Sequence, residues 1–180
     1  LEMGQDRAQV LTGVSSCYPK GYQLSTDGNE VGSGNFEACA IEIERKFNEL
    51  CDSLKIVDCL FNTNFEANTE SDFIAIAAFY YTFSFLEIED TVALANLIEI
   101  GTAFCGQSWE ELKKKYPNEP ESRLKSYCFN AAYFWRLMNE GYNFNKDTII
   151  RTKNEIKDSD ISWTLGAVID LELGHEPEKY

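Results

Sequence analysis

The chain has 180 residues, of which 44% are apolar and 26% charged, as in globular domains rather than disordered segments. Its 30 acidic and 16 basic residues give a formal net charge of -14, a surface that repels phosphate backbones and argues against general nucleic-acid binding. No apolar run approaches the roughly 20 residues that a membrane-spanning helix needs, so the sequence predicts no membrane segment in this chain.

The first third of the chain is predicted to pass from turns into a long helix. Residues 4–16 are expected to form a short helix, and residues 17–35, with their glycines and one proline, to form loops or hairpin-like strands. From Asn35 the apolar residues recur at three- and four-residue steps, which is typical of an amphipathic helix with Asn35 as its N-cap. A short strand is expected over 56–61.

The rest of the chain is predicted to be mostly helical. A capping sequence at 69–72 precedes an apolar helix over 73–87, and the next helix is expected from about 90 to 106. Later elements follow the same signals: a helix from Ser108 to Pro117, a long helix over 121–140 closed by Gly141, a strand over 148–157 and a final helix over 161–171. This order predicts a mixed, helix-rich α/β chain.

The cysteines and the single histidine limit which kinds of site the chain can contain. Without a C-x-x-C pair, and with only His175 in a polar tail, neither a zinc site nor a Ser/His/Asp triad is supported. The even cysteine count fits a disulfide framework formed in an oxidising compartment, with every pairing open from spacing alone; six buried free thiols in a cytosolic protein are the alternative. Neither of the common glycine-rich phosphate loops is present.

Aromatic residues crowd the segment 73–86. Most of them must be core at helical spacing, but the hydroxyls of Tyr80 and Tyr81 need partners or solvent, so at least one should reach a cleft. Arg123 begins another helix, and its guanidinium facing a phenol ring could clamp a flat heterocycle by stacking and cation–π attraction. The alternative is that Tyr81 is core and Arg123 an ordinary surface residue.

Several stretches, taken in order, resemble the C-terminal part of the apyrase (ecto-nucleoside triphosphate diphosphohydrolase) family. They are LEMGQDR at 1–7, CYPKGY at 17–22, GSGNFEAC at 32–39, the segment 51–61, FIAIAAFYYTFSFL at 73–86, FCGQSW at 104–109, RLKSYC at 123–128 and SDISWTLGA at 159–167. The resemblance implies a lobe of the actin/hexokinase-like (ribonuclease H-like) α/β fold, stapled by disulfides Cys17–Cys39, Cys51–Cys59 and Cys105–Cys128. Residues 1–153 would form the second, nucleobase-binding lobe, and 154–180 a strand and helix returning to a first lobe absent from this chain.

The resemblance also implies site residues. Tyr81 and Arg123 match the side chains that stack on the nucleobase, and Ala78 lines the same slot. Asp6 and Gln5 match the loop at the base and ribose edge. Trp163 matches an aromatic near the inter-lobe cleft; the alternative is a core tryptophan that packs in the hinge.

The activity implied is hydrolysis of terminal phosphates of nucleoside tri- and diphosphates by an activated water. The phosphate-binding loops, the glutamate base and the main contacts to a bridging Ca²⁺ or Mg²⁺ would lie N-terminal to Leu1, so no catalytic or metal-binding residue is expected in this chain. Its partners would be the nucleotides and the N-terminal half of the same enzyme, in a secreted or secretory-lumen protein. Two alternatives stay open: a catalytically inactive nucleotide-binding or structural module, and a disulfide-rich interaction domain with a chance likeness.

Overall fold

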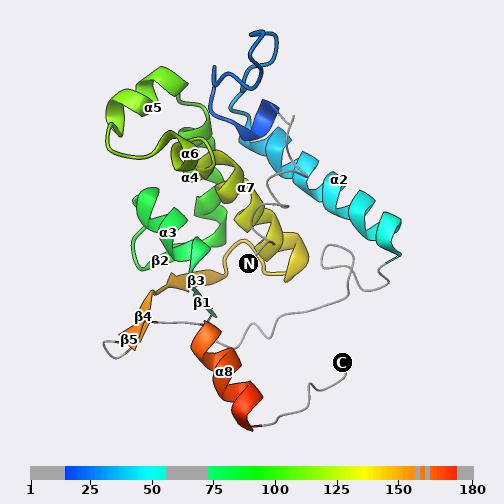
Figure 1. Cartoon of the computed structure of the whole chain (residues 1–180), viewed down its shortest axis with the longest axis vertical. Coiled ribbons are helices and arrows are strands. Elements are labelled where there is room, and N and C mark those ends of the chain that lie inside the picture. The colour runs from blue at the N-terminus through cyan, green and yellow to red at the C-terminus, as the bar shows by residue number, and fades with distance from the viewer. Residues whose placement is uncertain (1–14, 56–72, 157–158, 161–162, 174–180) are drawn as a thin grey trace.

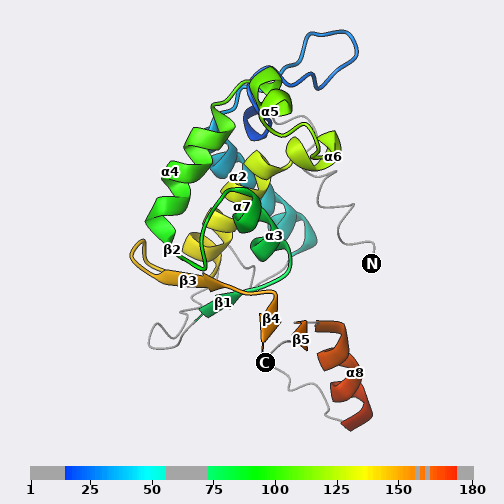
Figure 2. The same cartoon turned by 90° about the vertical axis from the view of Figure 1, so that its left-hand side faces the viewer.

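The computed structural model describes residues 15–55, 73–156, 159–160 and 163–173. The helices α2 (Phe36–Leu54), α4 (Leu94–Cys105) and α7 (Tyr127–Arg136) form the body, with the shorter α3 (Ala78–Phe85), α5 (Trp109–Lys115) and α6 (Glu121–Leu124) packed around it (Figure 1). A small sheet lies across one end of this body, and α8 (Trp163–Leu173) projects beyond the sheet (Figures 1 and 2). In the part of the chain that the structure describes, every helix is too short or too polar to cross a bilayer.

Helix α2 forms as its sequence predicts. The Asn35 side chain accepts a hydrogen bond of 2.9 Å from the backbone N–H of Ala38, which confirms Asn35 as the N-cap. The inner face buries Phe36, Cys39, Ala40 and Ile43, while Lys55 ends the helix in the left-handed conformation.

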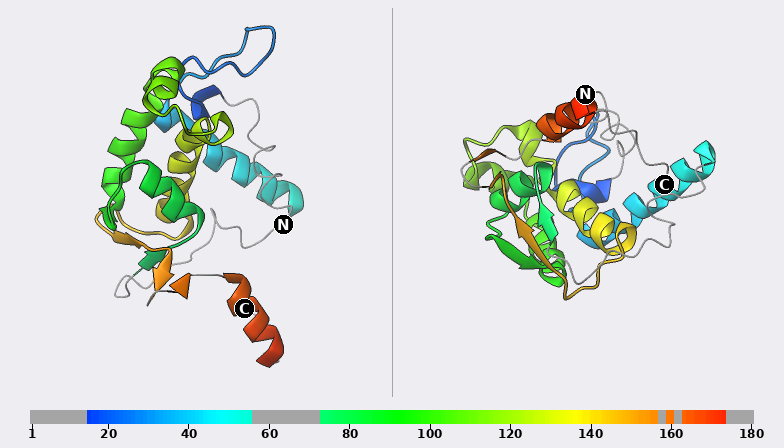
Figure 3. Two further views of the ribbon diagram at one scale, coloured as in Figure 1. Left: turned by 60° about the vertical axis from the view of Figure 1, so that its left-hand side comes forward. Right: turned by 90° about the horizontal axis from the view of Figure 1, so that it is seen from below.

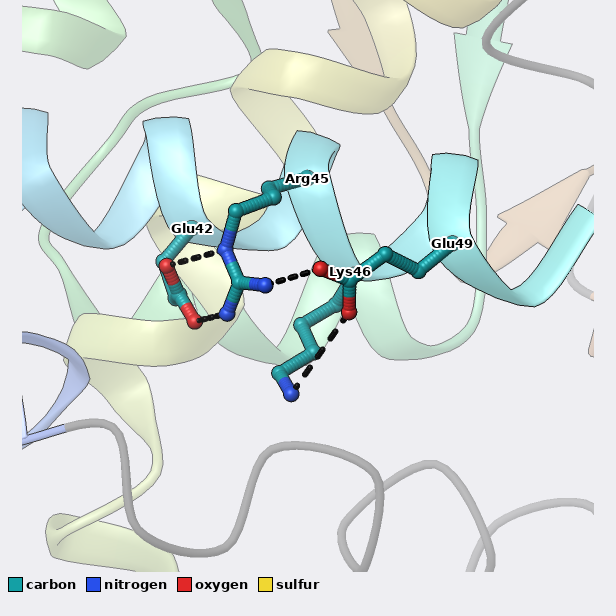
Figure 4. Close-up of polar contacts among 4 residues, drawn as sticks. All are labelled: Glu42, Arg45, Lys46 and Glu49. Atoms are coloured by element: carbon teal, nitrogen blue, oxygen red, sulfur yellow. Dashed lines mark hydrogen bonds and ion pairs between the residues drawn. The ribbon is translucent and has the colours of Figure 1, made fainter. Parts of the chain in front are cut away.

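The outer face of α2 carries a row of solvent-exposed ion pairs. Arg45 pairs with Glu42 one turn before it and with Glu49 one turn after it, and Lys46 lies 3.8 Å from Glu49 (Figure 4). Exposed pairs at this spacing each contribute only a few tenths of a kcal/mol. These pairs therefore add little to the stability of the fold.

Two predicted disulfides are confirmed. Cys17 is bonded to Cys39 and Cys105 to Cys128, and all four side chains are buried. The first ties the short helix η1 (Ser15–Cys17) to α2, and the second ties α4 to α7. Cys51 is also disulfide-bonded; its predicted partner Cys59 lies outside the described residues.

The core has two adjoining parts. The first joins α2, α4 and α7 around both disulfides, and the second joins α3, α4 and the sheet around Phe83, Leu97 and Ile150. Helices α2 and α4 approach closely because α4 carries Gly101 where they meet: a Cβ there would lie 2.2 Å from the ring of Phe36.

The sheet has the order β1-β3-β2. Strand β1 (Phe73–Ala75) pairs in parallel with β3 (Ile149–Thr152), and β2 (Thr91–Ala93) pairs with β3 in the antiparallel sense. Ile150 and Val92 face the helices, whereas Ile74 and Ile149 face outward and are exposed. A separate hairpin, β4 (Glu155–Ile156) and β5 (Ser159–Asp160), follows beneath the sheet and leads toward α8 (Figure 3).

Three of the predicted helices are longer than the helices that the structure contains. The segment expected as a helix over 73–87 begins as β1, because its first residues pair with β3, and the helix expected from about 90 begins as β2 for the same reason. The helix expected over 121–140 is divided into α6, α7 and the π-turn η2 (Leu137–Gly141). At the first division the carbonyl of Arg123 accepts hydrogen bonds from both the N–H and the hydroxyl of Ser126, which tightens the turn.

The helix from Ser108 is confirmed as α5, with the Ser108 hydroxyl and Glu111 forming a reciprocal capping box. The strand expected over 148–157 is found as β3 and β4, and the final helix as α8. The predictions for 4–14, 56–61 and 69–72 lie outside the described residues. The mixed α/β class is confirmed, since helices and a mixed sheet share one core.

Candidate functional site

Helix α3 begins at a sharp strand-to-helix elbow. Strand β1 ends at Ala75, whose carbonyl accepts a hydrogen bond of 3.2 Å from the N–H of Lys153. Ala77 then adopts φ 55° and ψ -120°, a backbone conformation that costs a non-glycine residue about 1–3 kcal/mol. Its carbonyl already accepts the N–H of Tyr81 at 3.1 Å, so the helix starts directly after the elbow.

Ring contacts and a hydrogen bond hold α3 against α7. The rings of Phe79 and Phe134 stack with centroids 4.0 Å apart, and those of Phe85 and Tyr127 stack at 3.7 Å with planes 4° apart. Between them the Asn130 side chain donates a hydrogen bond of 3.4 Å to the buried Thr82 hydroxyl. Residue numbers increase along α3 in the direction in which they decrease along α7, so the two helices are antiparallel. The contacts are spread along α3 and fix its whole length.

The side of α3 away from this packing carries the predicted site residues. Tyr81 is 67% exposed, so the alternative that it is a core residue is wrong. Ala78 lies one turn before it and is also exposed. The half-buried Tyr80 meets Tyr81 edge-on, with ring centroids 5.5 Å apart. The structure thus presents a tyrosine ring to solvent from a firmly anchored helix.

Arg123 lies on α6 and is exposed. It precedes Tyr127 by four residues, across the break between α6 and α7. Its charge acts on Tyr127, which stacks on Phe85 at the C-terminal end of α3, so Arg123 lies near this stack.

The Tyr127 hydroxyl anchors this region through a second contact. It donates a hydrogen bond of 2.9 Å to the carboxylate of Glu119, in the loop between α5 and α6. Burial of the ring, followed by this hydrogen bond and the charge of Glu119, raises the pKa of Tyr127 to about 12, and the nearby Arg123 charge lowers it in part. Tyr127 therefore keeps its proton at neutral pH and remains a donor to Glu119.

Sequence reasoning did not find the Ala77 elbow, the Phe85–Tyr127 stack or the Glu119 contact. The stack had a signal, since both aromatics lie four residues after a predicted site residue. Of the other predicted residues, Asp6 and Gln5 and the side chain of Trp163 lie outside the described part of the chain. Their roles stay predictions.

Three of the described acids have a pKa that departs from its ordinary value. Those with a shifted pKa have it lowered: Asp27 mainly by its hydrogen bond with the Ser25 side chain, Glu42 by Arg45, and Glu111 by Ser108. Among the described residues, no group of three or more His, Cys, Asp or Glu side chains could hold a metal ion.

A cavity of about 830 Å³ opens between α2, α4 and α7, lined in part by Phe36, Ile98 and Trp135. None of the predicted site residues lines it. It contacts the face of α7 that packs on α2, so it is separate from the surface that carries Tyr81.

The model of the GDA1/CD39 (nucleoside phosphatase) family matches residues 5–178. The chain is 34% identical over 145 residues to ectonucleoside triphosphate diphosphohydrolase 1 of Bos taurus, covering 78% of this chain and 28% of that protein. It is 30% identical over 207 residues to ectonucleoside triphosphate diphosphohydrolase 8 of Gallus gallus, covering 96% and 41%.

A plant protein is similar to the same extent. Probable apyrase 3 of Arabidopsis thaliana is 30% identical over 172 residues, which cover 85% of this chain and 36% of that protein. The chain therefore spans well under half of the length of these relatives.

Proposed function

This chain belongs to the GDA1/CD39 nucleoside phosphatase family, and we propose that it forms the nucleobase-binding half of a hydrolase that removes terminal phosphates from nucleoside tri- and diphosphates. The names of its relatives support this class of reaction, since they are triphosphate diphosphohydrolases and an apyrase. The chain would supply recognition of the base and part of the hinge between two lobes of an actin/hexokinase-like enzyme.

The observation that carries the proposal is the exposed ring of Tyr81 on an anchored helix. Large aromatic side chains are usually buried, and an exposed one costs free energy of hydration that a stacked ligand recovers. A base between Tyr81 and Arg123 would stack on the phenol ring and lie against the planar guanidinium, with the small Ala78 leaving room beside them. Because α3 is fixed by Phe79 and Phe85, the phenol ring would be presented from a fixed backbone.

Cleavage of the phosphates would take place in the N-terminal half of the enzyme. A bound Ca²⁺ or Mg²⁺ would neutralise and orient the substrate phosphates, but among the described residues no cluster of His, Cys, Asp or Glu side chains fits such an ion. We place the phosphate loops and the general base in the N-terminal half of the complete enzyme, so that this chain alone is inactive. What its own residues do is bind the base and orient the nucleotide.

Exposed apolar side chains support a partner half. Ile74 and Ile149 lie on the outer face of the sheet, and Val168 and Ile169 lie on α8; all four are exposed. Sheets built of parallel strands are usually covered on both faces, and two of the three strands of this mixed sheet pair in parallel. We infer that these surfaces are covered by the first lobe, to which residues 154–180 would return. The buried disulfides further support a secreted or secretory-lumen protein.

The first test is phosphate release from ATP and ADP, with Ca²⁺ or Mg²⁺ and then with chelator. We expect the isolated chain to release none, and the complete enzyme to release phosphate that chelator stops. Phosphate release by the highly purified chain alone would overturn the assignment of cleavage to the N-terminal half. A complete enzyme that binds nucleotides without hydrolysing them would favour the alternative, an inactive nucleotide-binding or structural module of the same fold.

The second test addresses the clamp. Tyr81→Ala and Arg123→Ala in the complete enzyme should each raise KM and change the preference among bases. Tyr81→Phe is the matched control, because it keeps the ring and should keep the KM. Unaltered kinetics in both alanine variants would remove the clamp from the proposal.

A further inference from the structure

Tyr80 has no role in the proposed clamp, yet it touches the ring that the clamp depends on. Its ring meets that of Tyr81 edge-on, with centroids 5.5 Å apart and planes at 73°. Edge-to-face contact places the positive ring edge of one aromatic against the negative face of another. Tyr80 is half-buried, whereas Tyr81 is 67% exposed. The more restrained ring therefore contacts the freer one.

The backbone beneath Tyr81 has little freedom left. Its neighbours Phe79 and Phe83 both contact Phe134 of α7, and Thr82 is bonded to Asn130. The Tyr81 side chain itself is largely exposed. An exposed side chain loses rotamer freedom when a ligand stacks on it, and this loss weakens binding.

We propose that Tyr80 is a positioning residue that holds the Tyr81 ring in its stacking orientation before the nucleotide arrives. The inference rests on the proposed function, since it gives Tyr80 a role only if a base stacks on Tyr81. Aromatic pairs of this geometry are strong enough to change a binding constant roughly 2- to 12-fold. The ring of Tyr80, not its hydroxyl, is the active part, because the contact is between rings.

The experiment is an ADP titration of the complete enzyme in chelator, which should stop hydrolysis, monitored by saturation-transfer and chemical-shift NMR, which detect weak binding. We expect Tyr80→Leu to weaken ADP binding roughly 2- to 12-fold without lowering the melting temperature appreciably, and Tyr80→Phe to restore wild-type affinity. Tyr80→Met, which keeps more flexible apolar volume, replaces the leucine variant if that one fails to fold. Tyr18→Leu is the matched control, since Tyr18 is another half-buried tyrosine paired with a neighbouring tyrosine, Tyr22, away from α3.

The outcomes separate this inference from the proposed function. If Tyr81→Ala abolishes ADP binding but Tyr80→Leu binds as wild type does, the positioning role is overturned and the clamp stands. If Tyr80→Phe is as weak as Tyr80→Leu, the hydroxyl is responsible and the ring contact is not. If Tyr81→Ala binds ADP as tightly as the wild type does, the clamp fails and the positioning role fails with it.

Discussion

The contact between Tyr127 and Glu119 predicts a specific loss of stability at alkaline pH. Burial first, and the hydrogen bond to Glu119 second, raise the pKa of Tyr127 to about 12 in the folded chain. In the unfolded chain a tyrosine titrates near about 10. Because the folded pKa is the higher one, the protonated phenol stabilises the fold fully below about pH 10, and this contribution is lost as pH rises through about 12.

The magnitude follows from the difference between the two values. Each pKa unit corresponds to about 1.36 kcal/mol, so the free energy of unfolding should fall by up to about 2.7 kcal/mol over this range. At neutral pH, Tyr127→Phe keeps the stack on Phe85 but removes the hydrogen bond, which should cost about 1–3 kcal/mol because the acceptor is charged.

The assay is urea unfolding of the wild type and of Tyr127→Phe at several values between pH 7 and pH 11.5. The variant cannot ionise at this position, so the difference between the two free energies of unfolding isolates the phenol from all other titrating groups. We expect the wild-type advantage to be constant to about pH 9 and then to shrink steadily. A difference that stays constant to pH 11.5 would refute both the raised pKa and the protection of this hydroxyl by Glu119.

Other predictions concern the elements that position α3 and α7. Asn35→Ala should lower the free energy of unfolding by about 1 kcal/mol, measured by urea unfolding, because the N–H of Ala38 loses its cap; Asn35→Asp should retain most of the stability. Replacing both Cys105 and Cys128 by alanine should cost about 3 kcal/mol or more, since the bridge closes a separation of 23 residues; an unchanged melting temperature would contradict this. Ala77→Gly should stabilise the chain by about 0.5–2 kcal/mol, because relief of the strained φ and ψ outweighs the added freedom of glycine; a lower melting temperature would show that Ala77 is not strained.

The sequence predicted those elements whose signals are local. Asn35 and Ser108 are followed by helices α2 and α5, because a capping side chain and the amphipathic pattern after it decide the structure within a few residues. The segment 73–75 forms a strand rather than a helix because it pairs with 150–152, a partner far along the chain that no local pattern reveals. The elbow at Ala77 gave no signal either, since glycine is the usual marker of a positive φ.

The candidate site was predicted by resemblance more than by pattern. Aromatics cover nearly every side of the segment 73–86, so periodicity alone could not decide that Tyr81 is exposed while Phe83 is buried. That division depends on α7, whose Phe134 and Tyr127 fix which side of α3 faces inward. The disulfide pairings likewise could not be derived from spacing, because they depend on which helices pack together.

The position of the clamp determines which kinetic constant it should affect. Tyr81 and Arg123 would contact the base, which does not change during phosphate cleavage, so their contacts are equally strong in the ground state and in the transition state. Uniform binding of this kind lowers KM and leaves kcat unchanged. Tyr81→Ala should therefore raise KM for ADP with little loss of kcat, and should leave hydrolysis of inorganic tripolyphosphate, which has no base, unaltered. A fall in kcat for both substrates would instead mean that α3 helps to set the geometry between the lobes, and that the exposed tyrosine is part of the hinge.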